Sequence, residues 1–128
     1  MPLIITGFFG ASSIIMGAYA SHGLQAHISS YDFSLLQTAL NYQHTHSLVL
    51  LALALGFLVS DKLKGDKLLK ASFISFALGI ALFSFSLYAS VLFNLDSLRK
   101  ITPFGGSVLI ISWLLLMAKG IKEVKCKN

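Results

Sequence analysis

The fold of this chain is decided by residues 71–95, ASFISFALGIALFSFSLYASVLFNL, a stretch without a single charged side chain. A helix rises about 1.5 Å per residue, so about 20 apolar residues cross the roughly 30 Å hydrocarbon core of a bilayer. Three further charge-free stretches are long enough to hold such a helix: 1–31, 33–60 and 101–118. The charged residues are confined to the positions between and beyond these stretches, namely Asp32, 61–70, 96–100 and 119–127.

The composition indicates that lipid, rather than water, surrounds most of the chain. Charged residues make up 12% of the sequence, against about a quarter in soluble domains, while 55% is apolar and the mean hydropathy is +0.78. We therefore predict an all-α fold, a single membrane domain over 1–128 that forms an antiparallel four-helix transmembrane bundle. The expected helices cover about 3–21, 32–60 (with the span at about 45–60), 68–93 and 102–118.

The basic residues predict an orientation. The net charge of +5 does not indicate nucleic-acid binding, because the lysines and arginine flank apolar spans instead of alternating with aromatic residues on one face. Lys and Arg accumulate on the cytoplasmic side of a membrane. With both termini cytoplasmic, the four lysines of 61–70 and the four of 119–127 lie inside, and only Arg99 and Lys100 lie outside. Cys126 is then expected to be a free thiol in a reducing compartment.

Small residues mark the expected helix contacts, because helices in lipid associate through close backbone approach. Ser72, Gly79 and Ser86 are one heptad apart, a spacing that keeps one seam of a helix facing its partner. The other expected packing positions are Gly17 and Ser21 in the first helix and Gly105 and Gly106 in the fourth.

The second charge-free stretch is too long for one perpendicular span. Ser29 and Asp32 have the spacing of a capping box at its start. The section 33–44 that follows is amphipathic, with Gln37, Asn41 and His44 on one face. We expect this section to lie at the membrane interface or to cover the outer mouth of the bundle.

Neutral polar residues gather at the predicted outer ends of the first two helices, and polar residues within membranes are functional candidates. The candidate ligand cluster consists of His22, Tyr42, Gln43 and His46. A metal site is not expected, because His22 and His46 would have to meet across the bundle with no cysteine nearby. Haem ligation by two histidines, contact with a quinone or lipid headgroup, and simple hydrogen bonding between the helices remain alternatives.

The motifs of common enzymes are missing from the sequence. It contains no paired carboxylates within a span, no G-x-S-x-G and no H-E-x-x-H. Our leading hypothesis is a non-enzymatic accessory or packing module of a membrane assembly, whose partners are the bilayer and other subunits or a second copy. The alternatives are a module that binds a small molecule or cofactor in the outer leaflet, and a small transporter or channel.

Four ordered motifs carry a family resemblance. They are GAYASHGL at 17–24, YQHTH at 42–46, LFSFSLY at 82–88, and TPFGG at 102–106 followed by Trp113. The chain thereby resembles the YgdD/YwdK-type family of small bacterial membrane proteins, which has relatives among small eukaryotic transmembrane proteins. Ala20-Ser21 and Phe85 depart from the family pattern. The resemblance implies four spans in the bacterial plasma membrane and singles out His22 and His46, but it implies no particular activity.

Overall fold

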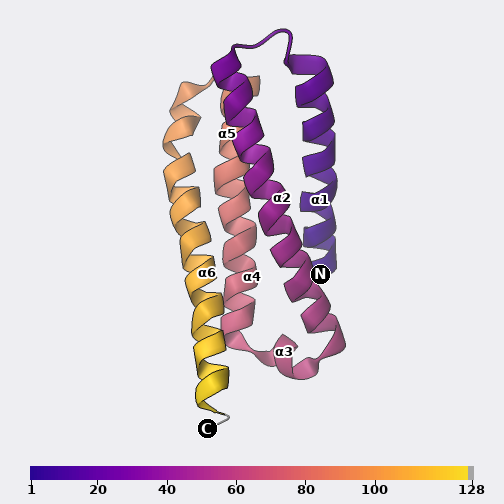
Figure 1. Cartoon of the computed structure of the whole chain (residues 1–128), viewed down its shortest axis with the longest axis vertical. Helices are drawn as coiled ribbons and strands as arrows, with labels where there is room; N and C mark the ends of the chain where they lie inside the picture. Colours follow the sequence, from indigo (N-terminus) through magenta and orange to yellow (C-terminus); the bar gives the residue numbers. More distant parts are fainter. Residues whose placement is uncertain (127–128) are drawn as a thin grey trace.

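The computed structural model describes residues 1–126 as a bundle of long helices without a strand in that range (Figure 1). The elements are, in chain order, α1 (Pro2–Tyr19), a π-helical turn (Ala20–Leu24), α2 (Ser30–Val59), α3 (Asp61–Gly65), α4 (Lys67–Ile80), a second π-helical turn (Ala81–Phe85), α5 (Ser86–Leu92), a 3-10 helix (Asp96–Lys100) and α6 (Thr102–Lys125). Lys127, counted above among the basic residues of the tail, lies outside the described residues.

Four of these helical segments are long and apolar enough to cross a membrane: Pro2–Leu24, Ser30–Val59, Lys67–Leu92 and Asp96–Lys125. The predicted all-α fold with four membrane-spanning helices is therefore confirmed. The first helix continues past Ser21 because a π-helical turn carries it through Gly23. The last extends beyond residue 118, where Lys119 pairs with Glu123 one turn further on and so supports the helix.

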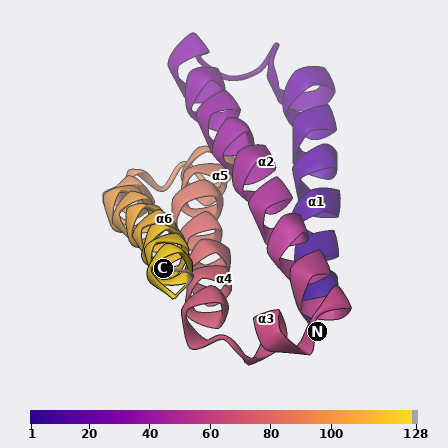
Figure 2. The ribbon, with the colours of Figure 1, turned by 60° about the horizontal axis from the view of Figure 1, so that its bottom comes forward.

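The helices pack as two pairs joined through their inner members. α1 packs on α2, α4 packs on α6, and α2 also contacts α4 and α5. α1 and α6 consequently lie on opposite sides of the bundle, with α2 and the α4–α5 helix between them (Figures 1 and 2). Both termini lie at the same end as α3 (Figure 1).

Two glycines allow α6 to approach the α4–α5 helix closely. A Cβ on Gly105 would collide with the backbone of Leu82 and Phe83, and a Cβ on Gly79 would lie 2.6 Å from the side chain of Leu109. Gly106 is less confined, since its nearest neighbour would be the Phe83 ring at 3.8 Å. This is the close backbone contact that small residues permit in lipid.

The serines of the same helix bond across to other helices. Ser72 donates to the Ser112 carbonyl oxygen at 3.0 Å, and the hydroxyls of Ser86 and Thr102 lie 2.8 Å apart. Each bond satisfies a polar group that would otherwise be costly in an apolar environment. The first helix is packed less closely at the small residues expected to mark its contacts. A Cβ added to Gly17 would lie 3.8 Å from the Leu40 side chain, which is an ordinary contact, and Ser21 is exposed.

The section 33–44 is the first part of the continuous helix α2. Ser29 caps it by accepting from the Asp32 amide at 3.0 Å, so the predicted capping contact is present. Leu36, Ala39 and Leu40 are buried in one of the two apolar cores, which also includes Leu87 and Val91. This section therefore packs inside the bundle along one face and is exposed along the other.

Ion pairs hold the two ends of the bundle. Asp32 at the start of α2 pairs with Arg99 at 2.8 Å, and Asp66 before α4 pairs with Lys119 of α6 at 2.8 Å. The Lys119 ammonium donates to the Asp66 carboxylate and, together with the Leu68 and Leu69 amides, holds the pKa of that carboxyl below its usual range. Each pair joins spans that are distant in sequence.

Candidate functional site

The structure separates His22 from the other three residues of the predicted cluster. His22 is exposed in the π-helical turn that ends the first span. His46 is buried, sixteen residues or about 24 Å along α2 from its start at Ser30. The meeting of His22 and His46 across the bundle, which a metal site shared by them would require, does not occur, because His22 lies at a helix end and His46 near mid-span. Within residues 1–126, no group of three or more His, Cys, Asp or Glu side chains lies together as metal ligands would.

Gln43 is fully buried and bonds to two other spans. Its Nε2 donates to the Phe9 carbonyl oxygen at 2.8 Å and to the Ser12 hydroxyl at 2.9 Å. Its Oε1 accepts from the Tyr88 hydroxyl at 2.7 Å. The orientation of the amide follows from chemistry, since a carbonyl oxygen such as that of Phe9 can only accept. Gln43 therefore ties α1, α2 and α5 together.

Both ring nitrogens of His46 are engaged. Nδ1 lies 2.7 Å from the Tyr42 carbonyl oxygen, and Nε2 lies 3.3 Å from the indole nitrogen of Trp113. An indole N–H can only donate, so Nε2 accepts and Nδ1 carries the proton. His46 is thus a neutral imidazole with no free nitrogen for a ligand. Its ring also packs against Phe76, with ring centroids 5.7 Å apart.

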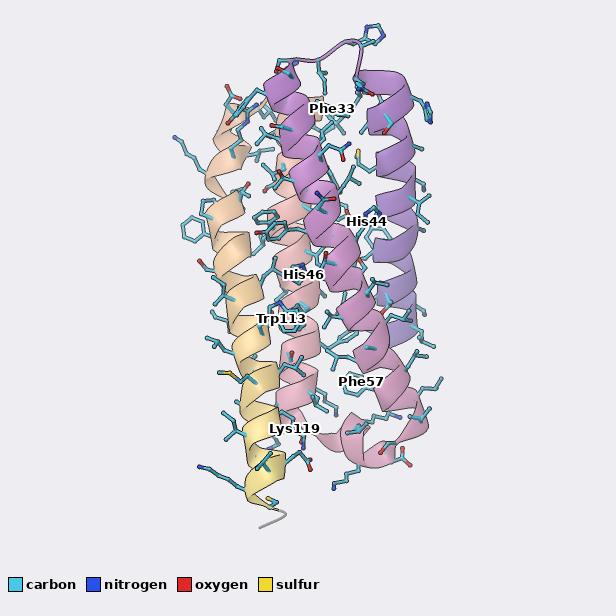
Figure 3. The ribbon with its side chains drawn as sticks, in the orientation of Figure 1. Phe33, His44, His46, Phe57, Trp113 and Lys119 are labelled. Carbon is cyan, nitrogen blue, oxygen red and sulfur yellow. The ribbon has the colours of Figure 1, made fainter. Side chains whose placement is uncertain are left out.

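A groove runs between α2 and α6, which touch through the contact of His46 with Trp113. The volume of the groove is about 590 Å³. Tyr42 forms part of its wall, with 43% of the residue exposed. The Tyr42 ring stacks on the ring of Phe83, and the two ring centroids are 4.3 Å apart. The buried His46 and the partly exposed Trp113 also line it, and Figure 3 labels both residues. Its polar lining is completed by Asn41, Thr45 and Ser107.

Sequence reasoning missed the partners of the buried polar residues. Trp113 enters the sequence analysis only as part of a motif, yet it donates to His46. Tyr88 was quoted only as part of a motif, yet it donates to Gln43. A signal was available, because a buried polar side chain is costly without a hydrogen-bond partner, and Tyr88 is the only tyrosine in 71–95.

The comparisons with known proteins agree with the fold. Residues 16–106 match the sequence model of a family described as "Protein of unknown function (DUF423)". A "UPF0382 membrane protein" of Haemophilus influenzae is 36% identical over 93% of this chain and 90% of its own length. "UPF0382 membrane protein YwdK" of Bacillus subtilis is 35% identical over 93% of this chain and 95% of its own.

A third relative, "UPF0382 inner membrane protein YgdD" of Escherichia coli, is 31% identical over 94% of this chain and 88% of its own length. No solved structure matches the chain significantly. The family model covers residues 16–106, which include all four quoted motifs except the trailing tryptophan. The chain is an integral membrane protein that belongs to the DUF423 (UPF0382) family, as its resemblance to YgdD and YwdK implied.

Proposed function

We propose that this protein is a non-enzymatic packing module of a membrane assembly, and that its contact surface is the outer face of α2. This face is defined by residues that are exposed or half-buried on the side of α2 opposite the core: Ser34, Gln37, Thr38, Asn41, His44, Thr45, Leu48, Leu51, Ala52, Leu55, Leu58 and Val59. In Figure 1, α2 runs in front of the α4–α5 helix.

The observation that carries the proposal is a set of polar side chains without partners near mid-span. Gln37, Asn41, His44 and Thr45 make no side-chain hydrogen bond within residues 1–126. Asn41 and His44 lie within about 5 Å of the middle of the thirty-residue helix α2. An unsatisfied polar group in hydrocarbon is costly, and such groups in membrane proteins hydrogen-bond to neighbouring helices. A polypeptide partner on this face would supply those bonds.

The internal polar groups support a structural role. The side chains of Gln43 and His46 form their hydrogen bonds with other residues of the bundle. The described carboxylates lie at the ends of the spans beside basic residues. General acid–base chemistry needs a positioned group that can exchange a proton with a substrate. Groups that are neutral and internally paired favour packing over catalysis.

The distribution of charge supports an orientation for this module. Lys62, Lys64, Lys67 and Lys70 lie at the same end of the bundle as both termini, and Arg99 and Lys100 lie at the other (Figure 1). The positive-inside tendency favours a cytoplasmic location for the lysine-rich end. We propose that both termini face the cytoplasm across the bacterial plasma membrane, the location that the name of the Escherichia coli relative gives for that protein.

Photo-cross-linking in native membranes tests the proposed surface. A benzophenone amino acid at Leu48, 67% exposed on the outer face of α2, should give adducts with polypeptide. The same probe at Ile14 of α1, 71% exposed, is the matched control and should give adducts with lipid. Lipid adducts alone at both positions would refute the packing function.

The groove between α2 and α6 favours a second candidate function, the binding of an amphipathic small molecule such as a quinone or a lipid. Its volume of about 590 Å³ lies in the range of small-molecule sites, about 300–1,000 Å³, and aromatic walls with a few polar groups are typical of them. Trp113, the only tryptophan of the chain, lines the groove. Titration with ubiquinone in nanodiscs should then quench its fluorescence saturably, and Tyr42→Ala should weaken this. Quenching that is non-saturable and unchanged in the variant would exclude a quinone site.

A further inference from the structure

We infer that the partner of the outer face of α2 is the same face of a second copy of this chain, related by a two-fold axis along the membrane normal. The inference rests on the proposed function, because it names the partner of that surface. Three properties of the face point to this partner: its spacing, its division into two halves, and its neutral self-complementary chemistry.

The spacing is that of a helix–helix seam. Ser34, Asn41, Leu48 and Leu55 are seven residues apart and all exposed. A seven-residue repeat keeps one line of side chains facing a partner helix when two helices supercoil left-handedly. The heptad line thus presents one asparagine at mid-seam, with leucines along the half nearer to α3.

The division into halves selects a parallel pair. The half of the face nearer the start of α2 is polar from Ser34 to Thr45, and the other half is apolar from Leu48 to Val59. Copies of one chain inserted by the same charge rule share one orientation, so two α2 helices meet in parallel. Each residue then faces its own counterpart, as in any two-fold interface. An antiparallel helix of the same kind would set leucine against the unpaired amides.

The chemistry is complementary to itself. The Asn41 amide carries both a donor and an acceptor, so two copies satisfy one another, and a single asparagine in such a seam fixes its register. Gln37 and His44 flank it and can also donate and accept across the pair. The face contains no charged side chain, so two copies do not repel each other, and a charged partner would find no counter-charge.

Disulfide trapping tests the pair in native membranes. With Cys126→Ser as background, single cysteines are placed at Asn41, Leu48 and Leu55 and oxidised with copper-phenanthroline. Facing positions of a parallel pair approach within the Cα separation of about 4.4–6.8 Å that a disulfide needs. We expect dimers linked through identical residues at all three positions. Controls on other helices, at Ile14 and at Ile110, 71% and 63% exposed, should stay monomeric.

The outcomes separate the inference from the function it rests on. Adducts of these cysteines with a different polypeptide would overturn the second copy as partner and leave the packing function in place. Monomers at every position would overturn the second copy as partner, and the benzophenone probe at Leu48 would then decide whether the packing function stands, because it also captures partners without a thiol. Asn41→Ala should lower the association constant about tenfold, equivalent to about 1.4 kcal/mol, while Ser107→Ala on α6 should leave it unchanged. Thermal unfolding followed by circular dichroism shows whether each variant keeps the native fold, and an unaffected dimer in folded Asn41→Ala would also count against the asparagine seam.

Discussion

Replacing Gly105 by alanine should destabilise the bundle, because no space for a methyl group exists between α6 and the α4–α5 helix. The added Cβ would lie against the Phe83 amide nitrogen and 2.7 Å from the Leu82 carbonyl carbon. Both are backbone atoms, so relief requires the two helices to move apart. Overpacking of this kind costs about 1–3 kcal/mol, from which the higher helix propensity of alanine recovers up to about 1 kcal/mol.

Two neighbouring glycines provide the comparison. Gly79→Ala would meet the side chain of Leu109 at 2.6 Å, which can rotate, and its backbone nitrogen at 3.2 Å, so a smaller loss is expected. Gly106→Ala would meet only the Phe83 ring at 3.8 Å, an ordinary contact. The expected order of stability is Gly106→Ala first, at or slightly above the native chain, then Gly79→Ala, then Gly105→Ala about 1–2 kcal/mol below the native chain.

The assay is reversible unfolding in mixed micelles with increasing dodecyl sulfate, followed by circular dichroism and by the fluorescence of Trp113. The difference between adjacent alanine variants at 105 and 106 is the informative quantity, because both changes add the same methyl group to the same helix. Equal stability of these two variants would refute the close contact between α6 and Leu82–Phe83.

Two further predictions concern polar groups. Tyr88→Phe leaves the buried Oε1 of Gln43 without a donor and should lower the free energy of unfolding by about 1 kcal/mol. Tyr19→Phe, at an exposed position, is the control and should have no effect. Equal free energies of unfolding for the two variants would argue against the hydrogen bond of Tyr88 to Gln43. The Lys119 contact lowers the pKa of Asp66 below the ordinary 3.8, so the ion pair should stabilise the fold fully above this pH and lose its effect as the pH falls through the lowered pKa. Asp66→Asn should make the free energy of unfolding less dependent on pH across this window. An unchanged pH dependence in the variant would contradict the pairing.

The fold was predictable because the bilayer imposes a simple rule. Charge-free stretches of sufficient length must be helical in lipid, since only a helix satisfies its backbone internally. The capping contact of Ser29 with Asp32 at the start of α2 was predictable from the spacing of a capping box. These features depend on neighbours in the sequence or on length alone.

The candidate site was harder to predict because it depends on rotation about the helix axes and on depth. His44 and His46 are two residues apart, so one is exposed and the other buried on opposite sides of α2 (Figure 3). His22 and His46 both belong to motifs of the family resemblance, but His22 lies at a helix end and His46 near mid-span. The pairing of Gln43 with Tyr88 joins residues 45 positions apart and requires the packing of α2 on α5 to be known.

The claim that the outer face of α2 is a protein contact is tested most directly by counting subunits in liposomes. A fluorophore on the exposed Cys126 marks each chain once, and photobleaching steps are counted while the protein is diluted in lipid. We predict two-step traces at high density that give way to single steps on dilution, with this transition shifted to about tenfold higher density in Asn41→Ala. Single steps at every density, or a transition unaffected by Asn41→Ala, would contradict the proposed pairing of α2.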